Sequence, residues 1–324
     1  DIDVRSNLKN HHYVSGPLRH LMVIGEYKHG KQQLAAGNLN ITASVNGAKT
    51  AAHVNGKLDY ANLKGLELIN KPYLLSTEAN IAFHSERPKH YTVEGYLGNL
   101  KIDEHREGNT VSLFNGDLNI HTTMAGNLVN GGANGVIRHA DLYQMGFVDK
   151  PFVSNCALNI DFSTDMAAKL MVKGMLGNLK VQADHKQFVP GDVTIDVLSR
   201  ADTTHAVIEG GDFALNTDWH GSYKHVLTAG EKIATNLQKQ VKNKRIDQTS
   251  LQKLLPIGQF KLVSGEGNLF SKLLEQQGYV FKTANINLTS SPLKGLNGNI
   301  VVDSLVYNDV KADSLIVDLT TNDT

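Results

Sequence analysis

The chain repeats itself: residues 55–102 read NGKLDYANLKGLELINKPYLLSTEANIAFHSERPKHYTVEGYLGNLKI, and residues 134–181 read NGVIRHADLYQMGFVDKPFVSNCALNIDFSTDMAAKLMVKGMLGNLKV. The two stretches lie 79 positions apart, align without a gap and share 16 identities in 48 positions. Repetition at this level, with no insertion, indicates two stacked structural units of the same kind. The repeat therefore favours an extended array over two unrelated globular domains.

Alternation of apolar and polar residues runs through the repeat and beyond it. Side chains two residues apart share one face of a strand, so such segments are predicted to be strands with one apolar and one polar face. The segments are Leu39–Val45, Thr77–Phe83, Leu118–Ile120, Val193–Val197, Ile286–Leu288 and Leu315–Leu319. Ile81 and Phe83 align with Ile160 and Phe162, which keeps the apolar faces of the two copies in register.

Glycine motifs separate or open these segments. Asn-Gly pairs are predicted to form tight hairpin turns, because both residues accept positive φ. They occur at Asn46-Gly47, Asn55-Gly56, Asn115-Gly116, Asn130-Gly131, Asn134-Gly135 and Asn297-Gly298. A second motif, Gly, then Asn or Asp, then an aliphatic residue or Phe, is predicted to begin strands. It begins at Gly37, Gly98, Gly116, Gly177, Gly191, Gly211 and Gly298. The apolar alternation changes parity at Gly98 and again at Gly177, which predicts a bulge or turn there.

A helical insert interrupts the strand pattern between Val226 and Leu255. An irregular apolar stripe surrounded by Lys and Gln predicts a first helix, and Asp247 is expected to cap a second one that Pro256 stops. The predicted organisation is therefore a β region over residues 1–225, the insert over 226–256 and a further β region over 257–324. Short amphipathic helices in a β chain typically cover an exposed apolar surface.

Composition narrows the function. The 324 residues carry 32 Lys plus Arg and 32 Asp plus Glu, and this zero net charge argues against a nucleic-acid binder. Cys156 is the only cysteine, so neither a disulfide framework nor a thiolate metal site is expected. The sequence lacks the nucleophile-elbow, phosphate-loop and zinc-helix motifs, and its 14 His show no ligand spacing. We therefore expect no catalytic residue, no metal and no cofactor.

One stretch resembles the TamB family of the AsmA-like bridging proteins. The resemblance is carried by five short segments: Lys244–Gln248, Leu254–Pro256, Gly265–Leu269, Ser290–Pro292 and Gly295–Gly298. It implies an interior or C-terminal portion of a longer periplasmic protein of a Gram-negative bacterium, anchored in the inner membrane and facing an Omp85-type outer-membrane barrel partner through parts not in this chain. It also implies an elongated, curled all-β sheet, a β-taco-like open groove, that carries phospholipids between the membranes.

The expected groove places phospholipid acyl chains on the apolar face. Its predicted lining consists of Ala79, Ile81, Phe83, Val93, Leu97, Leu118, Ile120, Leu158, Ile160, Phe162, Val172, Leu176, Val193, Ile195, Val197, Ile286, Leu288, Leu315, Val317 and Leu319. Asn80, Asn159 and Asp161 are expected outside. The predicted gate in the insert consists of Leu227, Ile233, Leu237, Val241, Leu251, Leu254 and Leu255.

Two other functions remain open from the sequence. An exposed strand edge could support the insertion of outer-membrane β-barrel proteins by edge pairing. A β-solenoid that binds or cleaves polysaccharide would show aromatic platforms and clustered carboxylates along one face, whereas this sequence has a single Trp, Trp219, and no row of carboxylates. The Lys232 to Arg245 segment is basic and is read either as a solvated face or as a contact with anionic headgroups.

The repeat also predicts the shape of the particle in solution. We expect small-angle X-ray scattering to give a radius of gyration clearly above the roughly 20 Å of a globular chain of this length. A value near 20 Å would contradict the extended array.

Overall fold

The computed structural model describes residues 2–7, 11–27, 30–106, 108–183, 186–245, 247–307 and 310–320. Ile246, which lies within the stretch resembling the TamB family, is outside the described residues. The chain is mostly β: its described strands belong to one 19-stranded sheet, which is a long antiparallel meander. This meander confirms the all-β class and the antiparallel repeats expected from the sequence.

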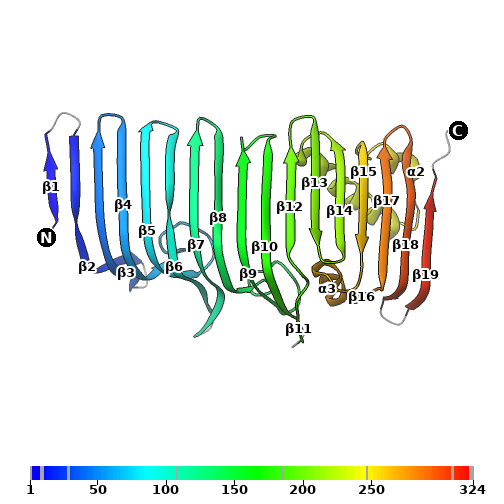
Figure 1. Ribbon diagram of the computed structural model, residues 1–324, viewed down its shortest axis with the longest axis horizontal. Coiled ribbons are helices and arrows are strands. Elements are labelled where there is room, and N and C mark those ends of the chain that lie inside the picture. Colours follow the sequence, from blue (N-terminus) through cyan, green and yellow to red (C-terminus); the bar gives the residue numbers. More distant parts are fainter. Residues whose placement is uncertain are drawn as a thin grey trace. The chain divides into compact units, whose positions relative to one another are not determined.

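The chain divides into two compact units, and the division falls within β9 and β10 and not at the helices. The first unit comprises Asp1–Asp161 and Asn178–Phe188, and the second comprises Phe162–Gly177 and Val189–Thr324. Within each unit the strands lie side by side in chain order (Figure 1), and the sheet neither closes nor curls strongly. The pronounced curl expected from the sequence is therefore not a feature of either unit.

The first unit is built from long strands. They are β1 (Asp3–Ser6), β2 (His11–Tyr27), β3 (Gly30–Asn46), β4 (Lys49–Asn62), β5 (Tyr73–Arg87), β6 (His90–Arg106), β7 (Asn109–Ala125), β8 (Leu128–Asp141), most of β9 (Phe152–Thr164), the end of β10 (Leu170–Ala183) and β11 (Lys186–Phe188).

The second unit has shorter strands and the three helices. Besides parts of β9 and β10 it contains β12 (Val193–Ser199), β13 (Thr203–Gly210), β14 (Phe213–His220), α1 (Tyr223–Lys242), α2 (Gln248–Gln252), β15 (Gly258–Ser264), α3 (Leu269–Gln276), β16 (Tyr279–Val280), β17 (Thr283–Ser291), β18 (Gly295–Tyr307) and β19 (Val310–Leu319).

The repeat in the sequence is a repeat in the structure. Strands β4 and β8 have the same length and begin 79 residues apart. Strands β5 and β9 also begin 79 residues apart. The connecting segments repeat their backbone hydrogen bonds too: Leu63 N–H donates to Tyr73 O, and Leu142 N–H donates to Phe152 O, both at 2.9 Å. The repeat predicted from the sequence is confirmed at this level.

The core of the first unit lies at the strand ends that meet these connecting segments. Its buried apolar residues include Leu34, Ala61, Leu100, Leu113, Ala140 and Phe152. Gly65 of the first connection packs against the Leu34 side chain, and its N–H donates to the side chain of Asn62 at 2.9 Å. The opposite strand ends carry the hairpin turns, and the apolar side chains there are only half-buried.

Most Asn-Gly pairs are not hairpin turns, which corrects the sequence prediction. Only Asn46-Gly47 is at a turn, whereas the pairs at residues 55, 115, 130, 134 and 297 lie inside strands. Gly56 and Gly135 have φ of 142° and 159°, and a Cβ on either would overlap the carbonyl oxygen of Asn38 or Asp117 on the neighbouring strand. Glycine is used here for close backbone approach within the sheet.

The second glycine motif marks bulges more often than strand starts. Strands β12 and β14 do begin after Gly191-Asp192 and Gly211-Asp212, but the other five copies lie within strands. At Gly98 the pairing of β6 with β7 shifts register between Leu97 and Leu100, which confirms the predicted bulge. Asn99 takes φ of 48°, and its N–H donates to Asp117 Oδ1 on β7 at 2.7 Å. The polar residue of one motif thus binds the N–H that a bulge frees on the next strand.

The helices differ in part from the predicted insert. Asp247 caps α2, as expected, with its Oδ1 accepting from Ser250 N at 3.1 Å, but α2 ends at Gln252, before Leu254 and Leu255. Helix α3 was not predicted, because Gly265-Glu266-Gly267 reads as a plain turn. Asn268 and Ser271 form a capping box at its start. An Asn three residues before a Ser was the available signal.

Candidate functional site

One face of the first unit is apolar along three neighbouring rows of side chains. Residues that pair directly across antiparallel strands project from the same face. The rows over β3 to β7 are Leu39, Gly56, Ala79, Leu97 and Leu118; then Ile41, Val54, Ile81, Gly95 and Ile120; then Ala43, Ala52, Phe83, Val93 and Thr122. Every one of these residues is half-buried. The seven predicted lining residues from Ala79 to Ile120 therefore belong to one surface.

The opposite face of the same strands carries a row of asparagines. Asn40, Asn55, Asn80, Asn119 and Asn134 follow one another across the sheet, with Tyr96 between the third and the fourth. All are exposed, and Asn119 Nδ2 donates to Asn134 Oδ1 at 3.2 Å. Amide side chains stacked across strands hydrogen-bond to one another and to water. The two faces of the sheet are thus chemically opposite.

Strand β9 keeps the same division. Leu158, Ile160 and Phe162 are half-buried, whereas Asn159 and Asp161 between them are exposed. Asp161 lies 3.6 Å from His121 Nε2 of β7, with Gly132 of β8 passing beneath the pair. A side chain at Gly132 would block that contact. Cys156 is buried on the same strand, and burial raises the pKa of its thiol.

The second unit has its own apolar face. Its rows are Leu176, Val193, Gly210, Phe213, Ser264, Ala284, Val302 and Leu315; then Gly174, Ile195, Ile208, Leu215, Leu262, Ile286, Ile300 and Val317; then Val172, Val197, Ala206, Thr217, Phe260, Leu288, Gly298 and Leu319. The ten predicted lining residues from Val172 to Leu319 lie on it. Their exposure differs, from 8% for Val193 to 38% for Leu315.

Helix α3 covers part of that face. Phe270 and Leu274 of α3 pack against a small core of Leu262, Phe281 and Ala284, and the rings of Phe270 and Phe213 lie 5.1 Å apart. Ile286, a predicted lining residue, packs against the same core. Its place in this core means that Ile286 already has protein partners on the face where a ligand was expected.

Helix α1 begins on the same side of the sheet. Ser199 projects from the apolar face, two residues after Val197, and its Oγ accepts from Tyr223 N at 2.8 Å. Ile233, Leu251, Leu254 and Leu255 of the predicted gate are half-buried. Leu227, Leu237 and Val241 are 63%, 42% and 59% exposed and so do not pack on the sheet. The gate itself stays a prediction, with these three side chains outside it.

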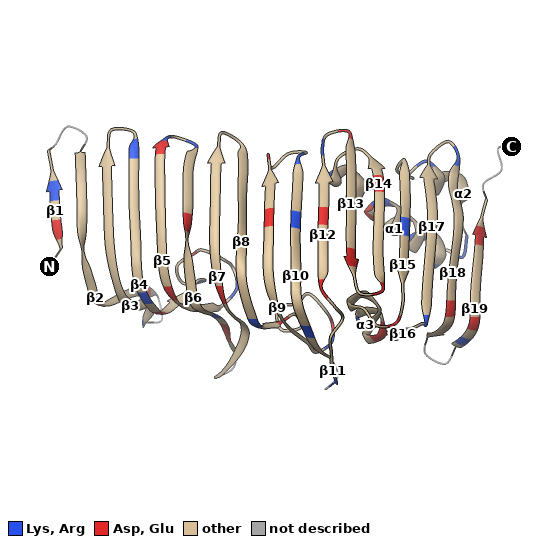
Figure 2. Cartoon of the chain, viewed as in Figure 1, with Lys and Arg blue, Asp and Glu red and all other residues tan. Residues whose placement is uncertain are grey.

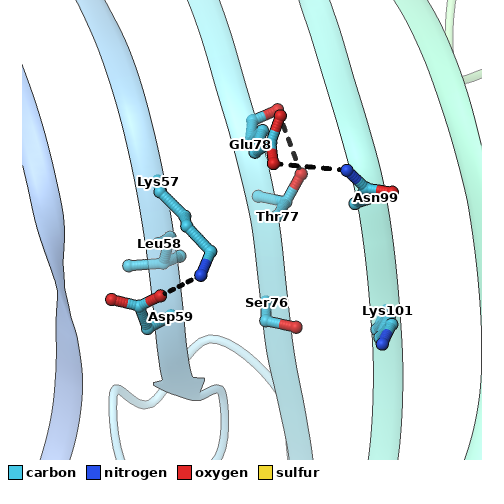
Figure 3. A pocket seen from close by; sticks show the side chains of 8 residues that line it. All are labelled: Lys57, Leu58, Asp59, Ser76, Thr77, Glu78, Asn99 and Lys101. Atoms are coloured by element: carbon cyan, nitrogen blue, oxygen red, sulfur yellow. Dashed lines mark hydrogen bonds and ion pairs between the residues drawn. The ribbon is translucent and has the colours of Figure 1, made fainter.

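A polar hollow of about 250 Å³ lies where β4, β5 and β6 bend (Figure 3). Lys57 pairs with Asp59 at 2.7 Å, and Asn99 Nδ2 donates to Glu78 Oε1 at 3.2 Å. Thr77 donates to Gly98 O at 3.0 Å. These groups bind one another around the bulge, so the hollow is explained by the bend of the strands.

A histidine–aspartate pair on the second unit is the arrangement that most resembles catalytic geometry. His205 Nδ1 lies 2.6 Å from Asp218 Oδ1, and Gln259 Nε2 donates to Asp218 Oδ2 at 2.7 Å. The bonds from Gln259 and His205 hold the pKa of Asp218 below its ordinary value. The three residues are direct cross-strand partners on β13, β14 and β15. Register alone accounts for their meeting.

Within the described ranges, no group of three or more His, Cys, Asp or Glu is placed to hold a metal ion. The described helices include none that is both long and apolar enough to cross a membrane. The candidate site is the apolar face of each unit, because rows of aliphatic side chains run there across neighbouring strands. Comparison of the chain with family models, with curated proteins and with solved structures gives no match.

Proposed function

We propose that the apolar faces of this sheet bind the acyl chains of phospholipid and serve as a hydrophobic conduit between the inner and outer membranes. In this proposal the chain is the periplasmic part of a longer, inner-membrane-anchored protein that resembles the TamB family and has an Omp85-type barrel partner. Transport needs no catalytic residue and no cofactor.

The observation that carries the proposal is the contrast between the two faces. The rows through Ile81 and Phe83 are apolar yet half-buried, while the asparagine row on the opposite face of the sheet is exposed to solvent. A half-buried aliphatic surface still offers area to a ligand, and each methylene that it buries contributes roughly 0.8 kcal/mol. Because the rows run across the strands, an acyl chain lying along them would pass from strand to strand.

The open sheet also suits the headgroup. Figure 2 shows most of each strand without charge, with isolated charged positions of both signs. An acyl chain on the apolar face could leave its headgroup in water at the margin, since the sheet does not enclose it.

Lipid binding is tested by replacing two apolar side chains of this face with serine. The variant Ile81→Ser with Phe83→Ser removes several methylene-sized contacts, so we expect phospholipid affinity to fall by about tenfold. Phospholipid that co-purifies with the chain is quantified by mass spectrometry, and affinity is titrated with a fluorescent phosphatidylethanolamine.

The matched control replaces two exposed residues of the other face, Asn55→Ser with Glu94→Ser. It should bind lipid like the wild type. Wild-type protein free of phospholipid and unable to bind it, or equal binding by both variants, would rule out the apolar face as the site. Suppression of outer-membrane protein aggregation by lipid-free chain would instead favour the chaperone function.

A further inference from the structure

Helix α1 carries two apolar stripes, and only one of them faces the protein. The inward stripe contains Val226, Ala229 and Ile233, of which Ala229 is 8% exposed. The outward stripe consists of Leu227, Gly230, Ala234, Leu237 and Val241, whose spacing of three and four residues aligns them along the helix. All five are exposed.

Exposure of this stripe is not the scatter of single apolar residues that any surface shows. An amphipathic helix on a water-soluble surface normally presents polar groups away from the protein. Here the outward stripe extends over four turns, from Leu227 to Val241, and leaves three large aliphatic side chains in water. A surface of this kind is expected to have an apolar contact outside the unit that carries it.

The main chains of two exposed apolar loop residues accept hydrogen bonds from α1 and α2. Lys224 Nζ of α1 donates to Met166 O at 2.9 Å, and the Met166 side chain is 64% exposed. Gln252 Nε2 of α2 donates to Leu293 O at 3.3 Å, and Leu293 is 86% exposed. Ser250 of α2 in turn accepts from Gln240 Nε2 of α1 at 2.9 Å. Met166 and Leu293 are therefore two further exposed apolar residues of the second unit whose main chains are hydrogen-bonded to α1 and α2.

The net positive charge of α1 and of the residues just after it identifies the chemistry of the partner. Residues 223–245 contain six cations and one anion, Glu231, although the whole chain has 32 of each sign. The cations are Lys224, Lys232, Lys239, Lys242, Lys244 and Arg245. The ion pairs of the described residues include none of them. Lys242 lies at the margin of the outward stripe, and Lys244 and Arg245 follow directly at the C-terminal end of α1, whereas Lys232 and Lys239 lie on the side of the helix away from the stripe. An apolar stripe with cations at its margin and end complements an anionic lipid surface, with aliphatic groups at the acyl boundary and cationic groups among the phosphates.

We propose that α1 docks the second unit on an anionic membrane surface through its outward stripe. The helix would lie in the plane of the headgroups, with Leu227, Leu237 and Val241 buried in the interface and Lys242 and Arg245 contacting phosphates. This docking goes beyond acyl-chain binding by the sheet and does not depend on it, because the outward stripe and the apolar face of the sheet are different surfaces.

Vesicle binding tests the docking. Wild-type chain is floated with vesicles of equimolar phosphatidylcholine and phosphatidylglycerol, and with vesicles of phosphatidylcholine alone. We expect binding to the anionic vesicles only, weakening as salt shortens the Debye length from about 8 Å at physiological ionic strength. The variant Leu237→Gln with Val241→Gln should bind about tenfold more weakly, and Lys242→Gln with Arg245→Gln between about tenfold and thirtyfold more weakly.

The controls separate this inference from the lipid conduit. Thr228→Gln with Thr235→Gln changes two exposed polar positions of α1 and should bind vesicles like the wild type. All substituted residues are exposed, and circular dichroism with Trp219 fluorescence verifies folding. Docking would be overturned if the wild type did not float with anionic vesicles, or if the Leu237/Val241 variant floated equally well. The lipid conduit is tested separately, by the amount of phospholipid recovered with the Ile81/Phe83 variant. If the wild type self-associated in the absence of vesicles and the Leu237/Val241 variant did not, the stripe would bind a second copy of the chain. That result would also overturn membrane docking.

Discussion

Replacing Phe152 with alanine should lower the free energy of unfolding by about 3–5 kcal/mol. Phe152 begins β9 and is 1% exposed, the largest fully buried side chain among the described residues. Truncating a ring in such a place removes its transfer free energy and leaves a cavity that the surrounding side chains fill only in part. The expected result is a clear fall in the midpoint of urea unfolding, followed by far-UV circular dichroism.

Phe147→Ala is the matched control, because it makes the same replacement in the adjoining connection. Phe147 is 75% exposed, so we expect a change within about 0.5 kcal/mol. Repeat arrays can unfold in parts, so the slope of the transition is compared as well as its midpoint. Equal effects of the two variants would show that the strand ends near Phe152 are not the core of the first unit.

Replacing Asn268 with leucine should cost about 3 kcal/mol in the second unit. Asn268 is fully buried, and its Nδ2 donates to Asp212 Oδ1 at 2.7 Å, and to Ser264 Oγ and Gly265 O at 2.9 Å each. Its Oδ1 accepts from Ser271 N at 2.8 Å and so caps α3. Leucine has a similar size but leaves these partners without their bonds, and buried polar groups without partners are costly.

Trp219 of β14 lies in the same unit, and its fluorescence follows the unfolding of that unit in urea. Asn285→Leu repeats the replacement at an exposed position of β17 and should change stability by less than about 0.5 kcal/mol. Ser271→Ala removes one half of the capping box and should cost about 1 kcal/mol. A loss from Asn268→Leu no larger than that from Asn285→Leu would refute the role given to this network.

The class of the fold and its periodicity could be predicted from the amino-acid sequence alone. Alternation places side chains on opposite faces of a strand with a period of two, so the apolar set from Ala79 to Phe83 could be assigned to one face before any register was known. The 79-residue repeat likewise predicted that β4 and β5 would recur as β8 and β9. These features are local or strictly periodic, and a single sequence carries them.

What the sequence left open were features that depend on a neighbouring strand. Asn55-Gly56 and Asn134-Gly135 look like hairpin turns, yet they lie within strands because each glycine admits a carbonyl oxygen from the strand beside it. The asparagine row across β3 to β8 is equally invisible in one strand, since its members come together only through register. The wrong turn prediction and the unpredicted asparagine row have the same cause, because the sequence of one segment does not show which residues of the neighbouring strand lie beside it.

The helices show the same limit in three dimensions. The apolar pattern predicted a helix near Val226 to Val241, but two stripes were available and only packing on the sheet could choose between them. Tertiary structure turned Ala229 and Ile233 inwards and left Leu227, Leu237 and Val241 in solvent. It also placed α3 on the apolar face, where Ile286 meets its core. The direction in which an amphipathic helix faces depends on the elements that it packs against, and those lie elsewhere in the chain.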